Sequence, residues 1–139
     1  KNLTFITNGL RNASILSDSA NVNIYLTGGK LNTQTNSIVG SSSVEYIRNF
    51  NCHAFFFSCS GISLNDGVTE ANVEQMEIKR EMLKHSKIHI LLADHTKFNK
   101  IFLCKNCGFE DVDYLITDEM PDQAYLELFE KTNTKVIVG

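Results

Sequence analysis

The residue types suited to anion binding follow several short apolar runs of the sequence. They are Thr7-Asn8-Gly9, Thr27-Gly28-Gly29, the segment 60–69 and Asp94-His95-Thr96-Lys97. Glycines let backbone amides approach an oxyanion, hydroxyls and side-chain amides donate to it, and a lysine adds positive charge. Asp66 adds an acceptor for sugar hydroxyls. This combination predicts a site for a small phosphorylated polyol.

Each of these pieces also has a plainer interpretation. Gly28-Gly29 can be simply a tight turn, Asp66-Gly67 is first of all a turn dipeptide, and Lys97 can be a solvated surface lysine. The same chemistry recurs after four apolar runs, and this recurrence favours one shared anion site. His95 is the one histidine beside that set.

Strand-like and helical patterns alternate along the chain and would position these residues. Strands are expected at residues 3–7, 23–27, 54–59, 88–93, 101–104, 114–117 and 135–138. Helices are expected at residues 14–17, 41–50 and 70–86 and after Pro121, with an extended polar excursion or hairpin at 31–39. The alternation predicts an α/β fold, a Rossmann-like, mostly parallel sheet with helices on both faces. In such sheets ligands bind outside the carboxyl ends of the strands.

Three local features refine this expectation. The run 54–59 is apolar on both faces, which predicts a central strand covered by helices. The spacing of Asn72 and Gln75 predicts a capped start for the helix of residues 70–86. Ser41, Ser42 and Ser43 are expected to cap the preceding helix.

The composition is that of one globular domain. The 139 residues are 42% hydrophobic and 21% charged, which allows a packed core. There are 13 basic and 16 acidic residues, and the resulting net charge of −3 has the wrong sign for a chain that binds nucleic acid by itself. No apolar run is long enough to cross a bilayer and no signal-peptide pattern is present, so we expect a cytoplasmic protein without a membrane partner.

The cysteines predict a reducing compartment rather than a chemical site. Cys104 and Cys107 have the two-residue spacer of a zinc or redox pair, but Cys52 and Cys59 do not supply a second pair with ligand spacing. We therefore expect ordinary semi-buried cysteines, no metal and no cofactor. No serine stands in a nucleophile-elbow context, so we expect no catalytic residue of that kind.

Several stretches together resemble the DeoR family of bacterial sugar-metabolism repressors, in their C-terminal effector-binding domain. The stretches are residues 66–72, 77–82 and 91–98. Thr7-Asn8-Gly9 is similar to the family's Thr-Asn-Ser, residues 26–29 to its Gly-Gly turn, and residues 115–118 to the strand before its last helix. The resemblance runs in order over essentially the whole chain.

The resemblance implies a fold related to ribose-5-phosphate isomerase and the CoA transferases. It also implies a homo-oligomer that binds a phosphorylated sugar effector and thereby switches an attached winged-helix DNA reader. The positions that it implies for the effector site are Thr7, Asn8, Gly9, Gly28, Gly29, Asp66, Gly67 and Lys97. In this comparison Asp66-Gly67 corresponds to the carboxylate loop of the isomerases and Lys97 to their phosphate-side loop. Asp94 and Lys79 match family motifs as well, where their role could be structural.

The sequence departs from the family pattern in two respects. Family members carry, upstream of this segment, a winged helix and then a strand that ends in an Asp-x-Gly-Thr-Thr-like loop, and neither is present here. Because the chain opens two residues before a core strand, we expect residues 1–139 to be an effector-binding domain that lacks its first strand-loop-helix. Gly9 stands where the family usually has serine, which removes one hydroxyl donor.

Two other function classes stay open at this point. An isomerase or an amino-sugar-phosphate deaminase could use the same fold, with Asp66 as base, but a second acid–base partner is not evident. An oligomerisation module would leave the polar strand ends as plain loops. Turnover of sugar phosphates would identify the enzyme, and unchanged melting across a ligand panel would favour the assembly module.

Overall fold

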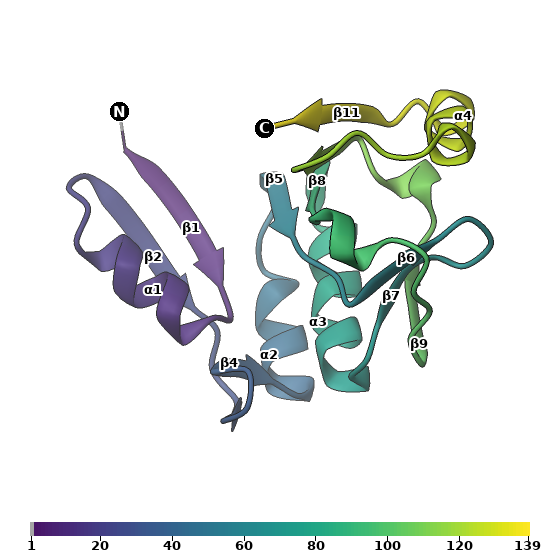
Figure 1. The fold of residues 1–139 in the computed structure, drawn as a ribbon. Coiled ribbons are helices and arrows are strands. Elements are labelled where there is room, and N and C mark those ends of the chain that lie inside the picture. Colours follow the sequence, from purple (N-terminus) through teal and green to yellow (C-terminus); the bar gives the residue numbers. More distant parts are fainter. Residues whose placement is uncertain (1) are drawn as a thin grey trace. The chain divides into compact units, whose positions relative to one another are not determined.

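A computed structural model describes residues 2–139, which pack as two compact units that meet in sequence at Phe50 and Asn51. The sequence predicts a single effector-binding domain over this length. Figure 1 shows both units and labels most of their elements. No helix within the described chain is both long and apolar enough to cross a membrane.

The first unit contains a parallel β-α-β motif followed by a hairpin and a helix. Its elements are β1 (Leu3–Thr7), α1 (Leu10–Ser17), β2 (Val22–Leu26), β3 (Lys30–Asn32), β4 (Ser37–Val39) and α2 (Ser41–Ile47). Strands β1 and β2 pair in parallel, and β3 and β4 form the expected polar hairpin. The turn of that hairpin is held by the Asn32 side chain, which accepts hydrogen bonds from the amides of Gln34 and Thr35.

The second unit is built on a four-stranded parallel sheet flanked by helices, which is consistent with the predicted Rossmann-like fold. Its strands are β5 (Cys52–Phe57), β6 (Gly61–Ser63), β7 (Gly67–Glu70), β8 (Ser86–Leu92), β9 (Cys104–Cys107), β10 (Tyr114–Thr117) and β11 (Lys135–Val138). Its helices are α3 (Val73–Lys84), η1 (His95–Lys97), η2 (Phe109–Asp111) and α4 (Gln123–Thr132). The parallel sheet has the order β11-β10-β8-β5, and β6, β7 and β9 form a separate antiparallel sheet.

One hydrophobic core holds the second unit together. Phe57, Leu91 and Leu115 from three parallel strands pack with Tyr125 and Phe129 of α4 in one buried cluster. Ile62 and Val68 of the antiparallel sheet belong to the same cluster. Burial of side chains of this size supplies the main stabilisation of such a unit. The core therefore fixes the antiparallel sheet against the parallel one.

Strand β5 is at the edge of the parallel sheet, so the prediction of a central strand was wrong. It pairs with β8 alone among the described strands. Phe55 and Phe57 point to the same face and stack with ring centroids 4.9 Å apart. Phe56 points to the opposite face and is 60% exposed. Alternation along the strand thus divides the apolar run between a packed face and an open one.

Two further expectations need correction. The strand expected at residues 101–104 begins only at Cys104, where it pairs with Glu70 of β7, and Leu103 before it is 84% exposed. Helix α2 starts after Gly40, without a side-chain cap from any described residue. The hydroxyl of Ser43 donates instead to the Thr27 hydroxyl at 2.7 Å, which removes it from the helix terminus. The cap of α3 is confirmed, because the Asn72 side chain accepts from the Gln75 amide at 3.1 Å.

Candidate functional site

In the first unit the polar residues after β1 and β2 lie side by side. The two strands pair in parallel with Thr7 opposite Leu26, and the Thr27 amide donates to the Thr7 carbonyl at 3.0 Å. The Thr7 hydroxyl accepts from the Gly9 amide at 3.1 Å. The structure thus brings residues 7–9 next to the start of Gly28-Gly29, as the sequence predicts for neighbouring strand ends.

Part of this polar set is already used within the unit. The Asn8 side chain donates to the Ile38 carbonyl at 2.9 Å, and the Asn8 carbonyl accepts from the Ile38 amide. Gly29 has a φ of +142°, and a Cβ there would stand 2.9 Å from the Val39 carbonyl oxygen. Gly28 has no atom of the described chain within 4 Å of such a Cβ. Close packing therefore requires glycine at 29, and Gly28 borders open space.

In the second unit, Asp94, His95, Thr96 and Lys97 follow β8 in a short 3-10 turn. The Asp94 carboxylate caps this turn by accepting from the Thr96 amide at 2.9 Å and from the Thr96 hydroxyl. These two bonds hold the pKa of Asp94 below its usual value. Lys97 is half-buried, and within residues 2–139 its ammonium forms no hydrogen bond or ion pair, although its charge helps to lower the pKa of Asp94. The turn thus presents a cation that has no direct ion-pair partner.

His95 joins the ends of β8 and β10. Its backbone amide and its Nδ1 each contact one oxygen of Asp118, at 2.7 and 2.6 Å, and Glu119 Oε1 lies 3.7 Å from the same ring nitrogen. The hydrogen bond to Asp118 raises the pKa of His95, and the same bond lowers the pKa of Asp118. The pair is therefore a charged link across the carboxyl end of the sheet at mildly acidic pH.

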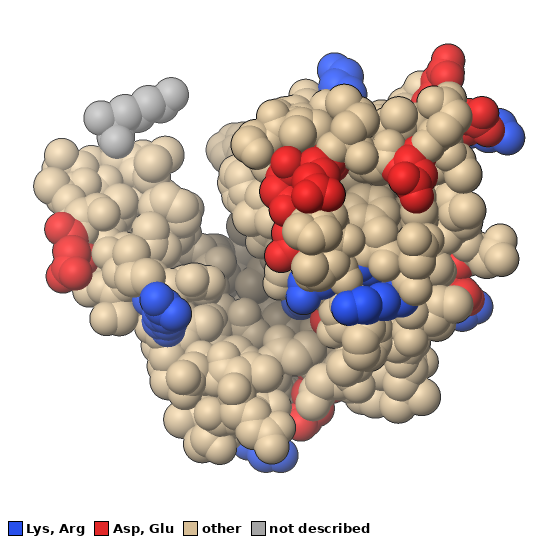
Figure 2. Space-filling model, in the orientation of Figure 1, with Lys and Arg blue, Asp and Glu red and all other residues tan. Residues whose placement is uncertain are grey.

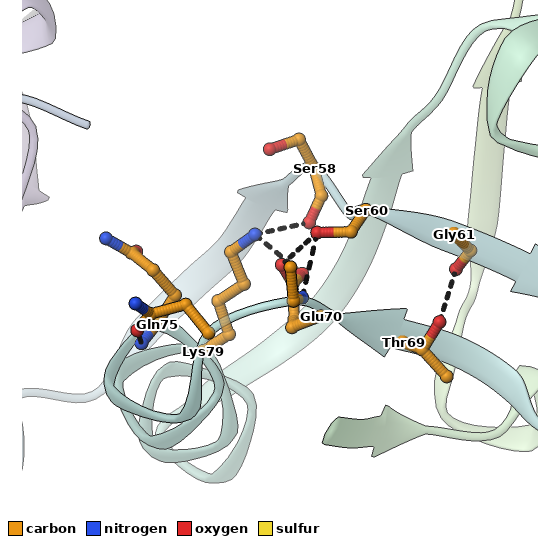
Figure 3. Close-up of polar contacts among 9 residues, drawn as sticks. Ser58, Ser60, Gly61, Thr69, Glu70, Gln75 and Lys79 are labelled. Carbon is orange, nitrogen blue, oxygen red and sulfur yellow. Dashed lines mark hydrogen bonds and ion pairs between the residues drawn. The ribbon is translucent and has the colours of Figure 1, made fainter. Parts of the chain in front are cut away.

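A mostly buried ion pair joins Glu70, at the end of β7, to Lys79 of α3, beside the loop that follows β5 (Figure 3). The Lys79 ammonium donates to Glu70 Oε1 and to the Ser58 carbonyl, both at 2.7 Å. The Ser60 hydroxyl donates to the other Glu70 oxygen at 3.3 Å and accepts from the Ala71 amide at 3.1 Å. This network fixes the loop of residues 58–60 at the carboxyl end of β5. Both charges are compensated internally.

Asp66 and Gly67 occupy a different place, the turn of the β6–β7 hairpin. Gly67 has a φ of +67°, and a Cβ there would stand 2.7 Å from the Cys107 carbonyl oxygen. The Asp66 carboxylate lies 3.5 Å from the ammonium of Lys105. Both residues line a cavity of about 310 Å³ to which neither residues 58–60 nor residues 94–97 contribute. Asp66 and Gly67 therefore follow a strand of the antiparallel hairpin and do not lie at the carboxyl end of a strand of the parallel sheet.

Cys59 and Cys107 of the second unit are poor nucleophiles. All four cysteines of the described chain are free thiols. Burial raises the pKa of Cys59 and of Cys107 to about 12 in each case. Such thiols stay protonated near neutral pH and react slowly.

The sequence indicates the strand ends at Thr7, Gly28 and Lys97 and includes Ser60 in the candidate segment 60–69, but it does not indicate Ser58 or the supporting pair Glu70–Lys79. Lys79 by itself does match a family motif. The apolar run predicts a strand that ends at Cys59 and contains Ser58, whereas β5 ends at Phe57. The polar residues Ser58 and Ser60 on either side of Cys59 were the available signal for an earlier strand end.

The chain is similar to known regulatory proteins. The sequence model of a protein family, the DeoR C-terminal sensor domain, matches residues 1–119. The chain is 34% identical over 135 residues to the HTH-type transcriptional repressor GlcR of Bacillus subtilis, covering 97% of this chain and 52% of that protein. It is 32% identical to the HTH-type transcriptional regulator GolR of Listeria innocua, with 99% and 54% covered. A putative aga operon transcriptional repressor of Escherichia coli O157:H7 is 29% identical, with 96% and 49% covered. The chain spans about half the length of the curated relatives it matches.

Proposed function

Since the chain belongs to the DeoR C-terminal sensor domain family, we propose that it senses a phosphorylated sugar intermediate at the carboxyl end of the parallel sheet in its second unit. The observation that carries this proposal is Lys97. It is a half-buried cation without a direct partner, held in a capped turn at the end of a central strand. A phosphate monoester would supply the direct ion-pair partner that Lys97 lacks and would accept charge-assisted hydrogen bonds.

Neighbouring groups would bind the remainder of the ligand. The Ser58 hydroxyl is exposed after β5, and the described residues give it no hydrogen-bond partner. Glu70 and Lys79 neutralise each other, so they hold the loop of residues 58–60 without adding net charge beside the ligand. The first unit separately contains the Thr7 hydroxyl and the Gly28 amide, groups of the kind that bind oxyanions, and substitutions there test whether this unit contributes to ligand binding.

We further propose that the longer regulator reads DNA through a segment outside these residues and assembles as a homo-oligomer. The named relatives are transcriptional repressors or regulators about twice as long as this chain. On the face shown in Figure 2, Lys and Arg side chains are scattered among acidic ones and form no extended basic surface. A ligand would act by binding two arrangements of the oligomer with different affinity, which changes the spacing of the DNA readers.

An enzyme on the same fold is less well supported. Proton abstraction from a sugar phosphate needs a free carboxylate close to the substrate. At the sheet end, Asp94 caps a turn, Asp118 bonds to His95, and Glu70 bonds to Lys79 and Ser60. Glu119 is the exposed carboxylate there, 3.7 Å from His95 Nδ1. The relatives are also named as regulators, which favours a sensor.

The experiment that tests the proposal is a calorimetric titration of the full-length protein. The ligands are hexose and pentose phosphates, each beside its unphosphorylated parent sugar, with product assayed after each run. We expect saturable binding of one phosphate, much weaker binding of its parent and no product. Absence of binding by every phosphate would remove the proposed function, and turnover would replace it with the enzyme.

A further inference from the structure

A β-bulge in the antiparallel sheet leaves one buried amide side chain without a partner. Along β7 and β9, Val68 is opposite Cys107 and Thr69 is opposite Lys105, so Asn106 is the extra residue. Asn106 is 5% exposed, and neither its side-chain nitrogen nor its oxygen has a hydrogen-bond partner within residues 2–139. Buried amides almost always have such partners, so this one calls for a ligand or a water.

The bulge is held in place by its backbone. Arg80 of α3 donates from Nε to the Asn106 carbonyl at 3.3 Å and from its terminal nitrogen to the Lys105 carbonyl at 2.5 Å. The conformation is thus stabilised by a charged side chain from another element. Bulges fixed in this way commonly direct a side chain at a functional site.

Asn106 borders two cavities. One, of about 310 Å³, is lined also by Leu64, Asp66, Lys105 and Glu110. The other, of about 430 Å³, is lined also by Lys84, His89 and Asp111. The first volume is at the lower end of the range for small-molecule sites, which fits a ligand of monosaccharide size.

The charges around the smaller cavity compensate one another. The Lys105 ammonium lies 3.5 Å from the Asp66 carboxylate, and the Arg80 guanidinium is bound to two carbonyls. Glu110 and Arg80 complete two acidic and two basic groups at its wall. Because these four charges sum to zero, the wall as a whole gives a phosphate no net electrostatic attraction. A carboxamide next to a carboxylate matches hydroxyl groups, which donate and accept at the same atom.

From these observations we propose that the cavity of Asp66, Lys105 and Asn106 is a second ligand site, and that it takes a neutral polyol such as an unphosphorylated sugar or sugar alcohol. A polyol hydroxyl pairs with the Asn106 amide after a small adjustment of the bulge, and Asp66 accepts from a second hydroxyl. This site is separate from the proposed phosphate site, since residues 94–97 do not line it. In this proposal Asp66 and Gly67 contribute to recognition of an unphosphorylated polyol and do not contact the phosphate of the other ligand.

Side-chain amide resonances of Asn106 in the full-length protein, assigned by NMR, test this proposal. The probes are D-glucose, D-galactose and D-glucitol, with inorganic phosphate as the charged comparison. We expect a saturable shift of the Asn106 resonances with at least one polyol and none with phosphate. If none of the three polyols shifted the Asn106 resonances, an internal water alone would account for the buried amide and the proposal would be overturned.

Variants distinguish this site from the phosphate site. Asn106→Leu removes the unpaired amide and is expected to raise the unfolding temperature while weakening polyol binding at least tenfold. Lys105→Ala changes a side chain that is 74% exposed, so it should fold normally, and it too should weaken the polyol. Lys97→Ala should leave polyol affinity unchanged, and Asn51→Leu, at an exposed position outside the cavity, is the matched control. Unaltered polyol affinity in both Asn106→Leu and Lys105→Ala would contradict the assignment, whatever the result for phosphorylated sugars.

Discussion

At the scale of single residues, Lys79 and Lys97 show how partners decide the role of a charge. Lys79 contacts a buried carboxylate and a carbonyl, so its charge is used to hold the loop of residues 58–60. Lys97 has no such contact within the described residues. The sequence could point to Lys97 because it follows a strand. It could not reveal the Glu70–Lys79 pair, since that pair depends on how α3 packs beside β7.

Replacing Lys79 should destabilise the fold more than it changes chemistry. Lys79→Met leaves Glu70, whose side chain is 5% exposed, as a buried carboxylate without its counter-ion. Removing one member of such a pair costs about 3–5 kcal/mol of folding free energy. Urea unfolding measures this loss. The control variant Lys131→Met changes an exposed lysine of α4 that forms no ion pair with any described residue, and its effect should be within about 0.5 kcal/mol. Equal effects of the two substitutions would contradict the buried-pair interpretation.

The His95–Asp118 link should depend on pH in a defined direction. The hydrogen bond raises the pKa of His95 above 6.5 and lowers that of Asp118 below 3.8. The His95 contribution to stability is therefore complete below pH 6.5 and is lost as pH rises through the raised pKa. The Asp118 contribution is present above pH 3.8 and is lost as pH falls through the lowered one.

NMR titration of the His95 ring tests this link. In Asp118→Asn the His95 pKa should fall markedly, because the main cause of its rise is removed. Glu119→Gln should lower it less, since Glu119 acts only through its charge. A larger fall in Glu119→Gln than in Asp118→Asn would show that the observed bond is not the cause.

At the scale of elements, a local signal predicted the start of α3, whereas the serine cap predicted for α2 was wrong and α1 begins at Leu10, four residues before the expected start. The Asn72 cap follows from residues three apart and is present. The position of β5 at the sheet edge depends on which strands pair, and an apolar run contains no information on that. The bulge at Asn106 likewise arises from the pairing of β7 with β9, which are far apart in sequence. The sequence therefore could not predict which strands pair when they are far apart along the chain.

The cap of α3 provides a test at this scale. Asn72→Ala removes the acceptor for the Gln75 amide and should cost about 1 kcal/mol in the free energy of unfolding. Asp122→Ala is the matched control, because Asp122 stands at the start of α4 without a side-chain cap bond to any described residue. Denaturant midpoints measured in parallel should shift for Asn72→Ala and much less for Asp122→Ala. The reverse order would refute the role of the cap.

At the scale of the whole molecule, the two units differ in how much core each contains. The large buried cluster draws its members from Phe57 to Phe129, all in the second unit. In the first unit the buried apolar side chains are Ile38, Val39 and Ile47 among the described residues. Small cores of this kind rarely stabilise a segment of about 50 residues. The α/β class was predicted from the sequence because strands and helices alternate along it. The division into two units was not predicted, because it depends on how densely the side chains pack and does not alter that alternation.

Separate expression of the units tests this asymmetry. Residues 51–139 should unfold cooperatively on heating, since their cluster is complete without the first unit. Residues 1–50 alone should lack dispersed amide resonances. Circular dichroism and amide spectra of the two segments measure both outcomes. A folded first segment beside an unfolded second one would contradict the account of where the core lies.

The proposed site depends on Lys97, which is inferred to recognise the phosphate of a sugar phosphate. The affinity of the full-length Lys97→Ala variant for the phosphorylated ligand found by calorimetry, and for its parent sugar, tests this role. Lys87→Ala is the control, because Lys87 is exposed near the start of β8, at the end of that strand opposite to the turn that contains Lys97. Loss of a charge-assisted contact predicts about 10- to 100-fold weaker binding of the phosphate ester, with little change for the parent sugar and none in Lys87→Ala. Equal losses for ester and parent, or an unchanged affinity for the ester, would contradict the claim.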